Sequence, residues 1–130
     1  MPNAIVSDRA PAPIGPYSQA IRAGDFLFLS GQIPLSPTDG TVVGITAAEQ
    51  AEQVLANLHA VLEAAGASAT DVVKTTIFLV DLDDFASVNE VYGRTFGLQG
   101  PAPARSTVQI SALPRGVRVE MDAIAHLTSR

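Results

Sequence analysis

The residues of this chain that could do chemistry on a small molecule are concentrated near its C-terminus. Arg105, Thr107 and Glu120 lie in two segments, 105–111 and 117–127, that are predicted to be strands. An arginine presents a planar fork that binds a carboxylate through two hydrogen bonds and stays charged at any working pH. A glutamate beside it can orient or deprotonate a water molecule. The combination predicts a site for an anionic small molecule that reacts with water.

The expectation that these three side chains meet depends on how the two strands pair. Side chains alternate along a strand, so Arg105 and Thr107 share one face of the first strand. If residues 113–116 form the loop of a hairpin, Glu120 comes opposite or diagonal to Thr107. We therefore expect a guanidinium, a hydroxyl and a carboxylate on one sheet face. The same spacing also fits a cross-strand ion pair from Arg105 to Glu120 or Asp122, with no ligand.

The rest of the chain predicts the elements that must hold these strands. A Pro-rich stiff loop is expected at 10–16 and a turn at 36–41. Thr46 and Glu49 form the pattern of a capping box at the start of a helix. The further strands are expected at 25–33, ending near Gly31, and at 72–80, and the helices at 46–66 and 81–97. The second helix is expected to start from an acidic cap at Asp81–Asp84 and to bury Phe85, Val88, Tyr92 and Phe96.

This order of elements predicts an α+β fold in a single domain spanning residues 1–130. Two helices cannot cover both faces of a sheet this wide, so both are expected on the same face. The uncovered face favours an oligomer, in which a second copy covers it. An antiparallel sheet with one solvated face is the alternative.

Composition excludes several classes of protein. Asp and Glu total 13 against 8 Lys and Arg, a net charge of −5 without a basic cluster, which argues against a nucleic-acid partner. The absence of cysteine excludes disulfides and thiolate chemistry. His59 and His126 lack neighbours at metal-ligand spacing, so no metal site is expected. No signal peptide or membrane-spanning segment is recognisable, so neither a membrane partner nor export is expected and the cytoplasm is the expected compartment.

Five blocks along the chain form a specific pattern: IGPYSQA (14–20), SGQIP (30–34), VKTTIFL (73–79), DFASVN (84–89) and PARSTV, LP and VEM within 103–121. They resemble the Rid (RidA/YjgF) family of reactive-imine deaminases. The resemblance implies a chorismate-mutase-like α+β fold with a mixed, mostly antiparallel sheet, assembled as a homotrimer with three clefts between subunits. It also implies hydrolysis of 2-iminobutanoate and 2-iminopropanoate to 2-oxo acids and ammonia, with no metal or organic cofactor.

The same resemblance implies roles for individual residues. Arg105 would bind the substrate carboxylate, Glu120 would orient the attacking water, and Tyr17 would close over the imine. The other residues implied to bind substrate are Ser30, Gly31, Asn89 and Thr107, with Gly31 and Thr107 acting through main-chain groups. From the residues alone, Tyr17 could equally be a packed aromatic side chain and Asn89 a solvated one.

Two departures from the family pattern bear on specificity. Position 107 is often cysteine in the family and is threonine here, which excludes a thiol role. The loop at 97–101 also differs from the commoner forms, which leaves the preferred substrate size open.

Other functions remain open at this stage. A deaminase specialised for a catabolic enamine, such as 3-aminoacrylate or 2-aminomuconate, is a variant of the same activity. A non-catalytic trimer that binds small carboxylates, or acts as a holdase, is a second alternative. A ribonuclease or translation inhibitor is a third, and the negative charge and the lack of a histidine pair argue against it.

Overall fold

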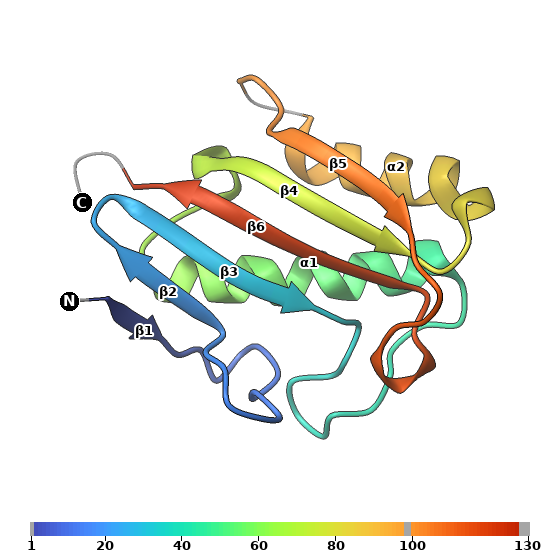
Figure 1. The fold of residues 1–130 in the computed structure, drawn as a ribbon, viewed down its shortest axis with the longest axis horizontal. Helices are drawn as coiled ribbons and strands as arrows, with labels where there is room; N and C mark the ends of the chain where they lie inside the picture. The colour runs from blue at the N-terminus through green and yellow to red at the C-terminus, as the bar shows by residue number, and fades with distance from the viewer. Residues whose placement is uncertain (1, 98–99, 128–130) are drawn as a thin grey trace.

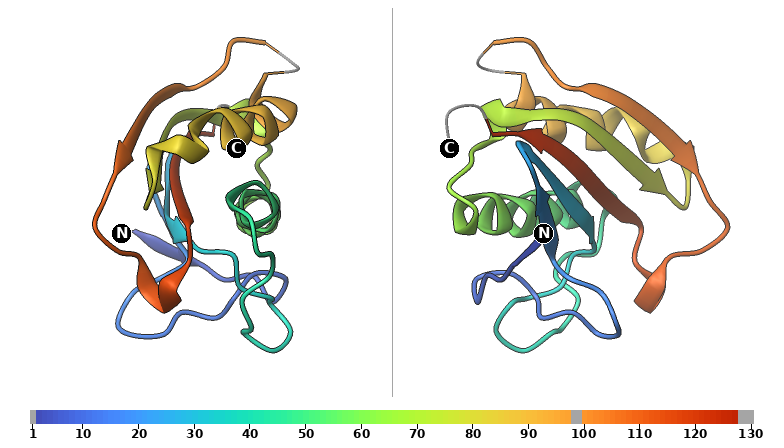
Figure 2. Two further views of the ribbon diagram at one scale, coloured as in Figure 1. Left: turned by 90° about the vertical axis from the view of Figure 1, so that its right-hand side faces the viewer. Right: turned by 60° about the vertical axis from the view of Figure 1, so that its left-hand side comes forward.

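The computed structural model describes residues 2–97 and 100–127 of the chain. It contains a six-stranded sheet with two α-helices packed on one face, as Figures 1 and 2 show. The helices are α1 (Ala47–Ala64) and α2 (Phe85–Phe96). The strands are β1 (Asn3–Ile5), β2 (Ala20–Ala23), β3 (Phe26–Gln32), β4 (Val72–Leu79), β5 (Ala104–Gln109) and β6 (Val119–His126). Three single-turn helices join them: η1 (Ala69–Asp71), η2 (Leu82–Asp84) and η3 (Pro114–Gly116).

The strands follow the order β1-β2-β3-β6-β4-β5 across the sheet. All neighbouring pairs are antiparallel except β4 and β5, which are parallel. The expectation of an α+β fold, with a mixed, mostly antiparallel sheet and both helices on one face, is confirmed. The sequence analysis did not define β1 and β2, which are three and four residues long.

The predicted hairpin between the last two strands is wrong. β6 lies between β3 and β4, whereas β5 forms the edge of the sheet beside β4. The physical reason is visible in the burial of each strand. Val119, Met121 and Ala125 of β6 are fully buried, as a central strand requires, while no residue of β5 is fully buried. Residues 110–118 therefore form a connection around the end of β4 rather than a tight hairpin loop.

The hydrophobic core lies between the sheet and the two helices. Every second residue of β6 and β4 points into it, against the apolar faces of α1 and α2. Burying each large aliphatic side chain of this layer contributes about 1.5–3 kcal/mol before the cost of ordering the chain. Its largest fully buried members are Leu27, Leu58, Leu62, Ile77, Leu79, Met121 and Leu127.

The predicted start and end of the first helix are confirmed. Glu49 N–H donates to Thr46 Oγ1 at 3.1 Å, and Thr46 N–H donates to Glu49 Oε1 at 3.0 Å, which completes the capping box. Backbone hydrogen bonds from Thr46 and Ile45 lower the pKa of Glu49. Gly66, with φ of 76°, follows the helix in the left-handed conformation that ends it.

The second helix differs from its prediction at its start. Asp81 caps the short turn η2 by accepting a hydrogen bond from Asp83 N–H at 2.9 Å, and α2 begins only after it. Phe85, expected in the core, is 40% exposed because the first residue of α2 lies at the rim of the helix layer. Val88, Tyr92 and Phe96 are buried as expected.

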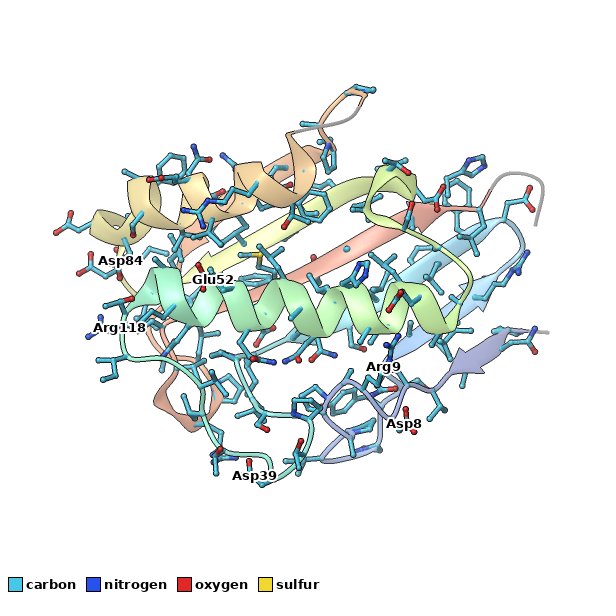
Figure 3. The ribbon with its side chains drawn as sticks, turned by 180° about the vertical axis from the view of Figure 1, so that it is seen from behind. Asp8, Arg9, Asp39, Glu52, Asp84 and Arg118 are labelled. Carbon is cyan, nitrogen blue, oxygen red and sulfur yellow. The ribbon has the colours of Figure 1, made fainter. Side chains whose placement is uncertain are left out.

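Two ion pairs tie the helix layer together on the side shown in Figure 3. Arg94 of α2 lies 3.5 Å from Glu52 of α1, and Arg118 lies 3.8 Å from Asp84 at the start of α2. Of the loop predicted at 97–101, Leu98 and Gln99 lie outside the described residues. Within the described ranges, none of the helices has the length and apolar character needed to span a membrane.

The capping box gives a stability prediction. Thr46→Ala removes the side-chain acceptor for Glu49 N–H, so we expect the free energy of unfolding to fall by about 0.5–2 kcal/mol in denaturant titrations. The matched control is Thr38→Ala, because Thr38 is an exposed loop residue outside any helix. Equal unfolding free energies for the two variants would contradict the role of the cap.

Candidate active site

Arg105 and Glu120 lie on opposite faces of the sheet. Arg105 pairs with Thr75 of β4, which is 1% exposed and faces α2, so its side chain lies on the helix side. Glu120 pairs with Phe78, one residue out of phase with the buried row of β4, so its side chain lies on the open face. The prediction that both residues share a sheet face is therefore wrong within one chain.

The alternative reading, a cross-strand ion pair, is also wrong. Among the described residues, Arg105 makes no ion pair with Glu120 or Asp122. The cause is the same topology, since β4 separates β5 from β6. The candidate residues instead form two groups, one on each side of the sheet.

The first group, which we call the arginine recess, consists of Phe85, Asn89, Tyr92, Arg105 and Thr107. Arg105 Nη1 donates to Asn89 Oδ1 at 2.8 Å. The guanidinium carbon lies 4.8 Å from the centroid of the Tyr92 ring and 5.5 Å from that of Phe85. Aromatic faces attract a cation without neutralising it. The guanidinium is thus held in place by uncharged groups and keeps its charge for an anionic ligand.

Tyr92 is held in position by a hydrogen bond to Thr75 of β4. Its hydroxyl and Thr75 Oγ1 form a buried hydrogen bond of 2.6 Å. Burial raises the pKa of Tyr92, an effect that the hydrogen bond to Thr75 and the charge of Arg105 oppose. The sequence analysis placed Tyr92 and Phe85 in the core and missed their contact with Arg105. Their spacing with Asn89, at i, i+4 and i+7 of one helix, was the signal that they share a face.

Two polar residues expected to bind substrate, Asn89 and Thr107, lie in the arginine recess. Asn89, for which substrate binding was expected, uses its side-chain oxygen to hold Arg105. Thr107 follows Arg105 on the same face, and its hydroxyl oxygen is buried without a hydrogen-bond partner among the described residues. A buried, unpaired hydroxyl is uncommon in folded proteins and marks a place where a polar partner is missing.

The second group, which we call the glutamate pocket, lines a cavity of about 570 Å³ on the other side. Its lining includes the predicted site residues Tyr17, Ser30, Gly31 and Glu120. The loops around this cavity meet at one end of the molecule, at the bottom in Figures 1 and 2. They are the segments before β2, between β3 and α1, and between β5 and β6.

Glu120 is the ionisable group at the base of this pocket. Burial raises the pKa of its carboxyl above the usual value, and the neighbouring charge of Asp122 raises it further. Gly31 lies directly against the carboxylate, because a Cβ added at Gly31 would overlap Glu120 Oε2. Gly31 belongs to the irregular part of β3, where the register to β6 shifts between Leu29 and Gln32. The glycine therefore allows the carboxylate to approach the β3 backbone.

Tyr17 and Ser30, both expected to contact substrate, line this pocket. Tyr17 is 51% exposed, so it is not a packed core aromatic. Ser30 Oγ donates to the Ser18 carbonyl at 2.6 Å, and Ser30 N–H donates to the Gln19 carbonyl at 3.0 Å. The Ser30 amide therefore holds the Tyr17 loop to β3 and is not free to bind a ligand.

Gln19 is a residue of this region that the sequence analysis did not single out. It is 3% exposed, and its side chain bonds Ser7 N–H and the carbonyl oxygens of Ser7 and Pro11 at 2.7–3.0 Å. These bonds replace the ladder that a Pro-rich segment cannot form, since proline lacks a backbone donor. A glutamine among apolar residues in the IGPYSQA block was the available signal.

Comparison with known proteins adds an independent observation. The sequence profile of the family described as Endoribonuclease L-PSP matches residues 7–127. The 2-iminobutanoate/2-iminopropanoate deaminase of Mus musculus is 49% identical over 121 residues, which cover 93% of this chain and 88% of that protein.

Two solved structures are similar over nearly the whole chain. A protein of the Rid family from Yersinia pestis superposes with a TM-score of 0.94 at 43% identity, covering 98% of this chain and 100% of the other. TdcF of E. coli, solved with bound serine, gives a TM-score of 0.92 at 42% identity, covering 97% and 99% of the two chains. The chain therefore belongs to the Rid (YjgF/RidA) family, whose sequence profile carries the description Endoribonuclease L-PSP.

Proposed function

We propose that this protein hydrolyses reactive 2-imino acids, such as 2-iminobutanoate and 2-iminopropanoate, to 2-oxo acids and ammonia. The observation that carries the proposal is the division of the site. One face of the sheet holds an arginine that has no carboxylate partner among the described residues, and the other holds a half-buried glutamate that lines a cavity. The activity named for the mouse relative requires both kinds of group, a cation for a carboxylate and an acid–base group for water.

The division implies that a complete site needs two chains. A substrate of a few atoms cannot contact Arg105 and Glu120 of one chain through the sheet that separates them. Arg105 lies on β5, the edge strand, where a second copy can approach the arginine recess. We infer that the arginine recess of one subunit faces the glutamate pocket of the next, and that this head-to-tail contact closes into a homotrimer.

The open face of the sheet supports self-association. Phe26 and Phe28 of β3 and Val108 of β5 are 43%, 46% and 40% exposed on it. Ile124 pairs with Phe28 on the same face, which extends the apolar surface across the sheet. Contiguous apolar surface of this kind usually marks a contact with another protein surface.

The chemistry then follows from the groups at hand. The guanidinium of Arg105 binds the substrate carboxylate, which places the imine carbon next to Glu120. Glu120 accepts a proton from a water molecule as the water oxygen bonds to that carbon. Glu120 returns this proton to the nitrogen and then accepts the proton of the newly added hydroxyl. As the C=O bond forms, the C–N bond breaks, and ammonia leaves a 2-oxo acid. A protonated imine is already a strong electrophile, so positioning supplies most of the rate and the proposal needs no metal or organic cofactor.

Tyr17 and Thr107 complete the proposed site. Tyr17 is half-exposed at the rim of the cavity and would close over the imine. Thr107 would offer its unpartnered hydroxyl, or the adjacent main chain, to the substrate carboxylate bound at Arg105. TdcF, the relative solved with serine, holds a ligand of the size and charge type that this arrangement fits.

The proposal is tested by following imine decay in a threonine dehydratase reaction, with and without this protein. We expect clear acceleration over spontaneous hydrolysis, and loss of it in Arg105→Ala and in Glu120→Gln. Because the site is divided, refolding the two inactive variants together should restore about one quarter of the parent activity, as random assembly of a closed ring predicts.

The matched control is a mixture of Glu120→Gln with the double variant Arg105→Ala/Glu120→Gln. Because neither chain in this mixture has Glu120, no interface can hold an intact site. Recovery in the control, or no recovery in the mixture of single variants, would contradict the divided site. A parent protein that fails to accelerate imine decay while binding 2-oxo acids would favour the non-catalytic carboxylate-binding trimer. Cleavage of single-stranded RNA by clean protein, lost in Glu120→Gln, would favour the ribonuclease that the family description names.

The aromatic support of Arg105 gives a second prediction. Tyr92→Leu removes a ring 4.8 Å from the guanidinium, so we expect KM for the imino acid to rise about threefold to thirtyfold, with a smaller effect on kcat. Tyr92→Phe keeps the ring and loses only the hydrogen bond to Thr75, so its KM should stay near that of the parent. Equal KM values for the two variants at similar unfolding free energies would show that the ring does not position Arg105.

The raised pKa of Glu120 predicts the pH profile. The base is active when ionised, so the rate should fall on the acid side at a pH above 4.5, the usual value for glutamate. Asp122→Asn removes a neighbouring negative charge and should move this limb to lower pH, whereas Asp83→Asn, outside the pocket lining, should not.

The raised folded-state pKa of Glu120 also predicts how stability depends on pH. The stabilisation that Glu120 contributes is present below its unfolded-state pKa, and it is lost as the pH rises through its folded-state pKa. Unfolding free energies of Glu120→Gln should therefore lack this decline.

A further inference from the structure

The glutamate pocket contains a second charged group that the proposed reaction does not use. Arg115 lies in η3, on the connection between β5 and β6, and lines the same cavity as Glu120 and Tyr17. Its Nη1 donates to the carbonyl oxygen of Gly40 at 3.3 Å. The cavity is therefore lined by an exposed cation, Arg115, as well as by the half-buried carboxylate of Glu120.

The charge of Arg115 has no carboxylate partner in the described part of the chain. Arg9, Arg94 and Arg118 each lie within 4 Å of a carboxylate oxygen. Arg115 contacts only a neutral carbonyl oxygen there, and a guanidinium has five N–H donors. Most of its binding capacity therefore remains for an anion, and it can take a carboxylate in the two-point geometry that arginine favours.

The backbone at Arg115 is also unusual. Its φ of 62° and ψ of 15° lie in the left-handed region, and among the described residues it is the sole non-glycine residue with positive φ. A residue with a Cβ occupies this region at a cost, and glycine, asparagine or aspartate does so more readily. Such strain collects at binding sites, where a side chain must be aimed in a particular direction. Here the residue in this conformation lines the glutamate pocket.

In the single chain the cavity has a volume of about 570 Å³, more than a three- or four-carbon imino acid fills, and in the proposed trimer the arginine recess of the neighbouring subunit covers part of it. Besides Glu120 and Arg115, its lining includes the aliphatic side chains of Ile14, Ile33 and Leu35. A ligand that fills it should carry a short aliphatic chain that ends in a negative charge.

We propose that Arg115 forms a subsite for a second carboxylate, so that the preferred substrates are 2-imino dicarboxylic acids. This inference rests on the proposed function. The α-carboxylate binds Arg105 of the neighbouring subunit, the imine carbon lies beside Glu120, and the distal carboxylate binds Arg115. Water adds to the imine carbon and ammonia leaves as in the reaction above, so the product is a 2-oxo dicarboxylic acid. Oxidation of an acidic 2-amino acid is the class of reaction that supplies such an imine.

The experiment compares 2-iminoglutarate with 2-iminopropanoate, each generated in the assay by an amino-acid oxidase. We expect the parent protein to favour the dicarboxylic imine in kcat/KM by about tenfold or more, as a charge-assisted contact predicts. Arg115→Gly should remove this preference and leave 2-iminopropanoate turnover within about twofold of the parent. Glycine suits the left-handed backbone, so this variant relieves strain and should fold at least as well as the parent. Arg94→Ala, an arginine outside the pocket, is the matched control.

A binding measurement separates this inference from the proposed function. Titration with 2-oxoglutarate and 2-oxobutanoate, followed by NMR, should show tighter binding of the dicarboxylate in the parent and equal binding in Arg115→Gly. If the parent hydrolyses 2-iminopropanoate without preferring the dicarboxylic imine, the subsite is refuted and the proposed function stands. If no imine is hydrolysed, the proposed function fails, and the titration alone decides whether Arg115 binds the second carboxylate. Equal losses for both substrates in Arg115→Gly would also overturn the subsite.

Discussion

The alternation of side chains across β4 determines where each candidate site residue points. β4 pairs with β5 on one side and with β6 on the other. Each residue of β5 and β6 therefore has its side chain on the same sheet face as the β4 residue with which it pairs, either the buried face or the open face. Arg105 pairs with Thr75, and Glu120 pairs with Phe78. A shift of one residue in either pairing would move the side chain of Arg105 or of Glu120 to the other face of the sheet. The fully buried residues of β6 resist such a shift, because it would expose them to solvent. The separation of cation and carboxylate is thus as stable as the core itself.

The two groups are held by different kinds of structure. Arg105 projects from a strand onto a helix, and Asn89, Tyr92 and Phe85 fix it with contacts that leave its charge intact. The glutamate pocket combines a strand residue with loops, whose anchors are the buried Gln19 and the half-buried Ser30. A firmly held cation and a pocket built from loops fit the proposed reaction, in which the carboxylate is common to all substrates and the side chain varies.

Local patterns were sufficient to predict much of the fold, and pairing was where they failed. The capping box at Thr46, the end at Gly66 and the alternation within β6 depend on neighbours in sequence, and all three were predicted. The position of β6 between β3 and β4 depends on contacts between distant segments, and a short loop with Pro and Gly favoured a hairpin instead. The same error placed Arg105 beside Glu120. The family resemblance, which uses the pattern of the whole chain, named residues that the structure places in the glutamate pocket and the arginine recess, but it did not locate their faces.

The residues that were missed share a physical reason. Tyr92 was expected only as a core residue and Gln19 was not singled out, and each is at most 5% exposed. Their second property, a polar atom or an aromatic face directed at a neighbour, becomes visible only when that neighbour is known. Arg115 is the opposite case, an exposed side chain in a turn, where sequence offers no reason to expect left-handed backbone at an arginine. A turn residue that keeps an unfavourable conformation beside a cavity is held there by the loops around it, and those loops also shape the pocket. The strain and the open cation therefore have a common origin in the way the β5–β6 connection closes over the open end of the sheet.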